Sequence, residues 1–163
     1  MKNEAILFVR DALRILYNLF SLLLYAQAEV NDLCREGNEP LIMNNYQKGW
    51  ALRYLREAKA EFIAAQKTPY VAPGLIVEAM RKAQAAIYYS LGDPASVEAI
   101  VRQTTRSKQF VKDPILRCLV EIERTVRRVA QTPESDREKA FQQADGLIQI
   151  ASDVVELFTG EKA

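Results

Sequence analysis

The sequence predicts an all-α protein, a single-domain bundle of five to six helices over residues 1–163. Three observations lead to this fold class. Apolar residues recur every three or four positions along nearly the whole chain, as they do on one face of an α-helix. No segment keeps the two-residue alternation of a half-buried strand. Glycine and proline are few, six of each, and most of them separate the periodic segments, where helices end or begin.

The first predicted helix, about residues 3–35, is the longest and most apolar. Its stripe consists of Ile6, Val9, Leu13, Leu16, Phe20, Leu23, Gln27, Val30 and Cys34. The run Ile15–Ala28 is shorter than the ~20 apolar residues that a membrane span needs. Helical periodicity also continues across Ala26-Gln27-Ala28, which superficially resembles a signal-peptide cleavage site. We therefore expect a buried helix in a cytoplasmic protein, with no membrane partner.

Two further helices are predicted on either side of a break from Lys67 to Gly74. They cover about Tyr46–Gln66 and about Leu75–Leu91. Their apolar faces consist of Ala51, Leu55, Ala58, Phe62 and Ala65, and of Ile76, Met80, Ala83 and Ile87.

Three later helices are predicted to start at Asp93-Pro94, Asp113-Pro114 and Thr132-Pro133. Each start pairs an N-cap side chain with a proline at the first helical position, where the missing N–H costs nothing. The helix after Asp93 has an apolar face made of Val97, Ile100 and Val101. The helix after Asp113 has one made of Ile115, Leu119, Ile122, Val126 and Val129. The helix after Thr132 has one made of Phe141, Ala144, Ile148, Ala151, Val155 and Phe158. Gly160 is placed to end the last helix.

The residue types exclude most catalytic chemistry. The chain has no histidine, which removes the commonest general base and the commonest metal ligand. Cys34 and Cys118 cannot supply four zinc ligands, and we expect both as buried thiols. There is no glycine-rich phosphate loop, and carboxylate pairs such as Glu57 and Glu61 are typical of a solvated helix surface. The sequence predicts no enzyme, no cofactor and no metal; a site built from carboxylates alone is the remaining enzymatic alternative.

A local excess of positive charge is the strongest functional signal, because the net charge of the whole chain is only +1. Between residues 102 and 128, eight cations oppose three acids, Asp113, Glu121 and Glu123. The cations are Arg102, Arg106, Lys108, Lys112, Arg117, Arg124, Arg127 and Arg128. We predict that this basic stretch binds a nucleic acid through its phosphates, without reading its sequence.

The basic stretch has two parts. The helix after Asp113 would carry a polar stripe on the side opposite its apolar face, made of Arg117, Glu121, Arg124 and Arg128 with Arg127 beside it. The preceding segment, 104–112, combines hydroxyl groups, cations and an amide, all of which suit phosphate oxygens. Phe110 in this segment either anchors it in the core, the commoner role, or stacks on a base.

A second, weaker basic patch is predicted on the second helix, where Glu57 and Glu61 dilute it. It consists of Lys48, Arg53, Arg56 and Lys59. These cations are equally suited to ion pairs within the protein. Two alternatives to nucleic-acid binding stay open: a solvated surface without a partner, and a helical scaffold or oligomerisation protein whose basic patch docks an acidic protein. Trp50 and the nearby tyrosines suit either the core or such a protein interface.

The chain resembles the small subunit of a CRISPR interference complex of the Cascade type. The resemblance rests on the helical bundle, the lack of catalytic groups and the basic residues on one flank. The abrupt start, Met1-Lys-Asn-Glu-Ala-Ile-Leu7, resembles type I-D systems, in which this subunit is translated from an internal start in the large-subunit gene.

This resemblance implies a non-catalytic subunit of a ribonucleoprotein. Several copies would stack beside the guide RNA–target DNA duplex, in contact with one another and with other subunits. The eight cations between residues 102 and 128 would hold the displaced or target DNA strand by its backbone. The near-neutral net charge departs from the more basic members of the family, so we expect a single subunit to bind DNA weakly.

Overall fold

The computed structural model describes residues 45–107, 111–131 and 136–161 of the 163 in the chain. These residues belong to two compact units. The first unit contributes Val111–Cys118 to the described residues, and the second contributes 45–107, 119–131 and 136–161. The single domain predicted over residues 1–163 stays a prediction.

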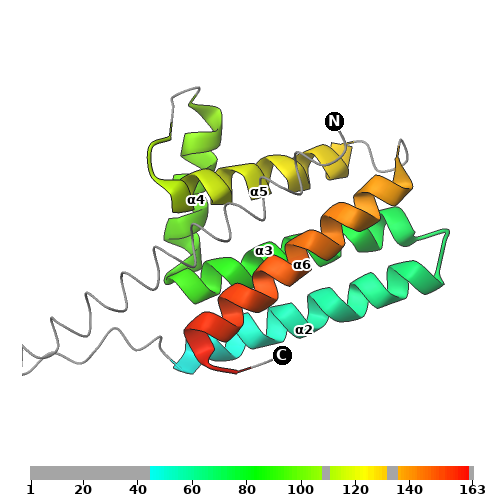
Figure 1. The fold of residues 1–163 in the computed structure, drawn as a ribbon, viewed down its shortest axis with the longest axis horizontal. Helices are drawn as coiled ribbons and strands as arrows, with labels where there is room; N and C mark the ends of the chain where they lie inside the picture. The colour runs from blue at the N-terminus through cyan, green and yellow to red at the C-terminus, as the bar shows by residue number, and fades with distance from the viewer. Residues whose placement is uncertain (1–44, 108–110, 132–135, 162–163) are drawn as a thin grey trace, which may run out of the picture. The chain divides into compact units, whose positions relative to one another are not determined.

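The regular structure of the described ranges is entirely helical, with no strand among them, which confirms the predicted all-α bundle. The helices are α2 (Asn45–Lys67), α3 (Ala72–Leu91), α4 (Pro94–Arg106), α5 (Pro114–Gln131) and α6 (Arg137–Thr159) (Figure 1). The helix predicted over residues 3–35, including Cys34 and the run Ile15–Ala28, lies outside the described residues.

The core of the second unit is built where α2, α3 and α6 pack against one another (Figure 1). Ala51, Ala58 and Ala65 are fully buried along α2 at intervals of seven residues, a spacing that keeps them on one side of the helix. Such small side chains let neighbouring helices approach closely. The largest fully buried side chains are Leu55, Ile76, Met80, Val101, Val120 and Val155.

The break between α2 and α3 is shorter than predicted. Only residues 68–71 separate the two helices, and Tyr70 within them is fully exposed. The predicted start of α3 at Leu75 is wrong by three residues, because the helix begins at Ala72. Pro73 stands in the first turn, where its lack of an N–H removes no helical hydrogen bond.

The N-caps predicted for α4 and α5 are confirmed. The Asp93 carboxylate accepts a hydrogen bond from the Ser96 backbone N–H over 2.9 Å, and a second bond, from the Ser96 hydroxyl, holds the pKa of Asp93 below its ordinary value. The Asp113 carboxylate accepts one from the backbone N–H of Leu116 over 2.7 Å. Both side chains satisfy donors that the first helical turn leaves without a partner.

Both ends of α6 have capping groups. At its start, the carboxylate of Asp136 accepts a hydrogen bond from the Lys139 N–H over 3.1 Å, so the helix begins at Arg137. The predicted start at Thr132-Pro133 lies outside the described residues. At its end, Gly160 adopts a left-handed conformation with φ of 70°, as the predicted C-terminal glycine requires.

The apolar face predicted for the short helix α4 is only partly correct. Val101 is buried and Val97 is half-buried, but Ile100 is 52% exposed and its predicted inward position is wrong. Successive residues of a helix are turned by about 100°, so Ile100 and Val101 cannot both point toward α3, the helix on which α4 packs.

Two of the remaining predictions can be compared with the described residues. Cys118 is buried, as predicted. In the ranges that the structure describes, no helix combines the length and the apolar character needed to cross a membrane.

Candidate nucleic-acid interface

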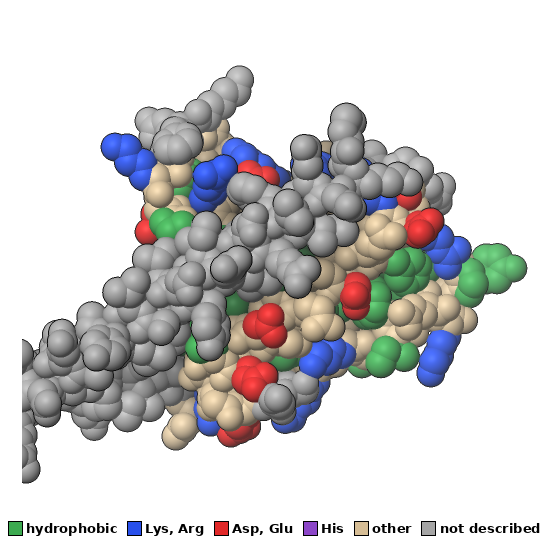
Figure 2. Space-filling model, viewed as in Figure 1, with side chains coloured by type: hydrophobic (Ala, Val, Ile, Leu, Met, Phe, Trp, Pro, Cys, Tyr) green, Lys and Arg blue, Asp and Glu red, His purple; other side chains and the backbone are tan. Residues whose placement is uncertain are grey.

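Helix α4 positions the first cations of the basic stretch. Its buried Val101 anchors it in the second unit, and the neighbouring Arg102 is exposed. One turn earlier stands Glu98, whose carboxylate pairs with the Arg102 guanidinium over 2.5 Å. Arg106, in the last turn of α4, is also exposed and lies where a cation is favoured by the helix dipole. Figure 2 shows Lys and Arg side chains interspersed with acidic ones on the face that it presents.

The described residues of the first unit contain two of the predicted cations. Lys112 and Arg117 are both exposed, on either side of the Asp113 cap of α5. Lys108 and Phe110, also singled out from the sequence, lie outside the described residues.

The part of α5 in the second unit, residues 119–131, separates its faces as predicted. Arg124 and Arg128 are exposed. The buried positions are Leu119, Val120, Ile122, Val126 and Val129. Arg124 pairs with Glu121 over 2.6 Å, three positions earlier, and half-buried Arg127 pairs with Glu123 over 2.6 Å, four positions earlier. Three of the predicted cations, including Arg102, therefore already hold a carboxylate one helical turn before them.

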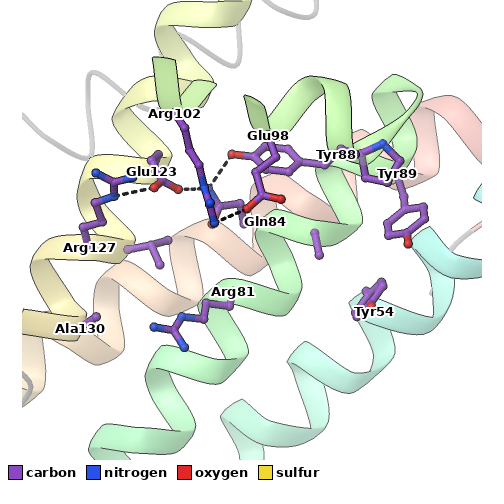
Figure 3. Close-up of a pocket in the computed structure, with 14 residues that line it drawn as sticks. Tyr54, Arg81, Gln84, Tyr88, Tyr89, Glu98, Arg102, Glu123, Arg127 and Ala130 are labelled. Atoms are coloured by element: carbon purple, nitrogen blue, oxygen red, sulfur yellow. Dashed lines mark hydrogen bonds and ion pairs between the residues drawn. The ribbon is translucent and has the colours of Figure 1, made fainter. Parts of the chain in front are cut away.

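A buried polar network joins α5 to α3. The Gln84 amide donates one hydrogen bond to the Glu123 carboxylate over 2.8 Å and another to the Tyr88 hydroxyl over 2.7 Å (Figure 3). Gln84 and Tyr88 are buried, and the side chain of Glu123 is only 13% exposed. Arg127 donates to the other oxygen of Glu123, so both oxygens of this carboxylate have partners. From the sequence, Glu123 is only one of three acids that oppose the cations, and no pattern predicts this network.

The burial of Tyr88 gives a testable pH dependence. Desolvation disfavours the phenolate and raises the pKa of Tyr88 to about 12. The unfolded chain loses this proton near its ordinary value of about 10, whereas the folded protein keeps it. The contribution of Tyr88 to stability is therefore complete below about pH 10 and is lost as the pH rises toward 12. An ultraviolet titration of tyrosinate should show one late step that the Tyr88→Phe variant lacks; identical curves would contradict this.

A pocket of about 700 Å³ opens in the second unit beside this network. It is bounded by α3, α4 and the second half of α5, with Tyr54 contributed by α2. Its polar lining consists of Arg81, Arg102, Arg127, Glu98, Glu123 and Gln84, and its aromatic lining of Tyr54, Tyr88 and Tyr89 (Figure 3). Two of the predicted cations, Arg102 and Arg127, thus meet at one concave surface.

The second predicted basic patch, on α2, contains several ion pairs. Lys48 pairs with Glu161 over 2.8 Å, and Arg53 pairs with Glu57 over 2.8 Å. Arg56 is exposed and Lys59 is half-buried. The hydrogen bond from Arg53 holds the pKa of the Glu57 carboxyl below its ordinary value.

Lys82 of α3 bridges two carboxylates of α2. Its ammonium pairs with Glu61 and, over 3.1 Å, with Glu57. The hydrogen bond to Glu61 is the main reason why the pKa of Lys82 is raised. These two carboxylates are thus engaged in holding α2 on α3. Within the described ranges, no group of three or more cysteine or acidic residues is placed to hold a metal ion.

A row of aromatic rings was not recognised as a unit from the sequence. Trp50 and Tyr54 of α2 both stack on Tyr89 of α3, with centroids 6.1 and 5.5 Å apart. Tyr46 meets Trp50 edge-on at 6.1 Å and is 63% exposed. The guanidinium of Arg53 lies 4.9 Å from the centre of the Trp50 ring. Three of these rings follow one another every four residues on α2, a signal that was available, but nothing in the sequence marks Tyr89 as their partner.

Comparisons with protein-family models, with curated proteins and with solved structures find no match to this chain.

Proposed function

We propose that this protein is a non-catalytic subunit of a ribonucleoprotein and that it holds nucleic acid by the phosphate backbone. The observation that carries the proposal is the exposure of the cations between residues 102 and 128. Six of the eight predicted residues are exposed: Arg102, Arg106, Lys112, Arg117, Arg124 and Arg128. Arginine suits this role because its planar guanidinium forms two parallel hydrogen bonds to a phosphate.

The ion pairs on these helices are compatible with phosphate binding. Arg102 and Arg124 pair with carboxylates that are more than a third exposed, so solvent screens the interaction. Exposed pairs of this kind contribute only about 0–1 kcal/mol to stability, and a phosphate can replace the carboxylate at little cost. The carboxylates also hold each guanidinium at the surface, which reduces the conformational entropy lost on binding.

The weak net charge fits a subunit that acts within an assembly. With a net charge of +1, a single copy offers few phosphate contacts, and several copies on one strand bind more tightly through their high effective concentration. In the Cascade-type complex that the sequence resembles, base pairing with the guide supplies the sequence specificity. A small subunit of that kind would grip the displaced or target strand without reading it, and the all-α fold is the one that the resemblance implies.

The proposal is tested with a variant of the full chain in which Arg106, Arg124 and Arg128 are changed to alanine. Fluorescence anisotropy would measure its affinity for single-stranded DNA across a series of salt concentrations starting at about 50 mM, where weak backbone binding is measurable. Three lost phosphate contacts should reduce the slope of log K against log salt by about 2 and weaken binding about tenfold at the lowest salt.

The matched control removes the same number of exposed cations from other helices. Lys67, Arg137 and Lys139 are exposed on α2 and α6, and their triple alanine variant should keep the slope of the unaltered protein. Equal slopes for all three proteins, or no DNA binding by any of them, would contradict the proposal. Binding of an acidic protein would then be the remaining function for the basic stretch.

A further inference from the structure

The pocket beside Gln84 has a composition that phosphate binding alone does not explain. Tyr54 and Tyr89 lie on one side of it, and Glu123 and Arg127 lie on the other (Figure 3). Its volume of about 700 Å³ is within the range of about 300–1,000 Å³ that is usual for pockets binding small ligands. A groove that only follows a phosphate backbone has no need of such a volume or of aromatic walls.

The tyrosine side of the pocket is arranged for stacking. The rings of Tyr54 and Tyr89 are 5.5 Å apart and inclined by 27°, and both are half-buried. Tyr89 is held in turn by Trp50, whose ring lies 6.1 Å away at 24°. The packed row fixes the orientation of both tyrosines before any ligand arrives, so a flat ring that enters the pocket meets aromatic surfaces that are already ordered.

The polar side of the pocket carries both signs of charge. Arg81 and Arg102 supply exposed guanidinium groups, and Glu98 supplies a carboxylate acceptor that is 45% exposed. The carboxylate of Glu123 adds negative charge but is already engaged by Gln84 and Arg127. The two carboxylates disfavour a purely anionic occupant such as an acidic peptide. They suit a ligand with an anionic group at one end and amino donors on a flat ring, since carboxylates accept hydrogen bonds from the amino group of cytosine.

We infer that this pocket binds one base of a single-stranded nucleic acid, with the base stacked against Tyr54 and Tyr89 and its phosphate held by Arg81 and Arg102. The inference rests on the proposed function, to which it adds a preference for single strands. A base in a duplex is already stacked and paired, so only an unpaired base enters the pocket without an unstacking cost. The pocket thereby gives one subunit a fixed point on a strand that it otherwise holds by charge.

The test compares two strands with the same phosphates, using the full chain at about 50 mM salt. One is an oligonucleotide of about 12 deoxycytidines, and the other has the same length but carries abasic sites throughout. Base–aromatic stacking is worth about 1–3 kcal/mol per base, so the deoxycytidine strand should bind about tenfold more tightly than the abasic strand.

Variants of the pocket then show whether the difference in affinity between the two strands comes from Tyr54. Tyr54→Ala should bring the deoxycytidine strand to the affinity of the abasic strand and leave abasic binding unchanged, whereas Tyr54→Phe should keep the difference. Tyr70→Ala is the matched control, because Tyr70 is fully exposed between α2 and α3 and lines no part of the pocket. If the unaltered protein binds both strands equally, the base pocket is refuted while backbone binding stands. If it binds neither strand, both proposals fail.

Discussion

Changing Leu55 to alanine is expected to lower the free energy of unfolding by about 3 kcal/mol, because it leaves a cavity in the core. Leu55 is 1% exposed on α2, where α2 packs on α3 and α6. Alanines at positions 51, 58 and 65 already bring the helices together at short distance, so the backbone has little freedom to close the cavity. Urea unfolding followed by circular dichroism measures the loss as a lower midpoint with an unchanged slope.

The matched control removes a side chain of the same size from the same helix. Ile63 is 48% exposed on α2, and Ile63→Ala should change the stability by less than about 0.5 kcal/mol. A loss of similar size in both variants would show that Leu55 does not occupy a closely packed core.

The second large effect is expected for Gln84→Ala, at about 2 kcal/mol. The substitution removes both hydrogen bonds of the Gln84 amide, and with them one partner each of the Tyr88 hydroxyl and the Glu123 carboxylate. Both of these groups are largely shielded from water, so water cannot fully replace the lost hydrogen bonds, and the folded state is destabilised. Urea unfolding gives the size of the effect. Hydrogen exchange should also show faster opening of the second half of α5, because the Gln84–Glu123 bond holds it to α3.

Gln142 offers the control for this substitution. It stands in α6, donates to Glu138 four positions away over 3.4 Å, and is exposed. Gln142→Ala should therefore leave the stability within about 0.5 kcal/mol of the unaltered protein. If Gln84→Ala were equally mild, the network between α3 and α5 would contribute nothing to stability, and the walls of the pocket would have to be held by other contacts.

Local signals account for the part of the fold that could be predicted. The starts of α4 and α5 were found because an aspartate N-cap and a proline at the first helical position act within one turn of chain. The apolar faces of α2, α3 and α6 follow from periodicity alone. The start of α3 was misplaced because Pro73 and Gly74 resemble a break, although proline fits the first turn of a helix.

The candidate site depends on contacts that no local pattern contains. Gln84 and Glu123 are 39 positions apart, and the stacking of Tyr89 on Trp50 and Tyr54 joins two helices. These contacts between helices depend on how the whole helices pack against one another. The pair of Arg102 with Glu98 was, by contrast, visible as a spacing of four residues. Glu98 lies just outside the stretch of residues 102–128, so that stretch is more neutralised than its own eight cations and three acids indicate.

The aromatic row has a consequence for how the protein can be observed. Trp50 is the only tryptophan in the chain, and it stacks on Tyr89, which forms part of the pocket wall. The one strong intrinsic fluorophore of the molecule is thus a single ring away from the proposed base site. The fluorescence of Trp50 therefore reports on that site without any attached dye. A nucleobase stacked in the pocket should change the intensity or the wavelength of this emission.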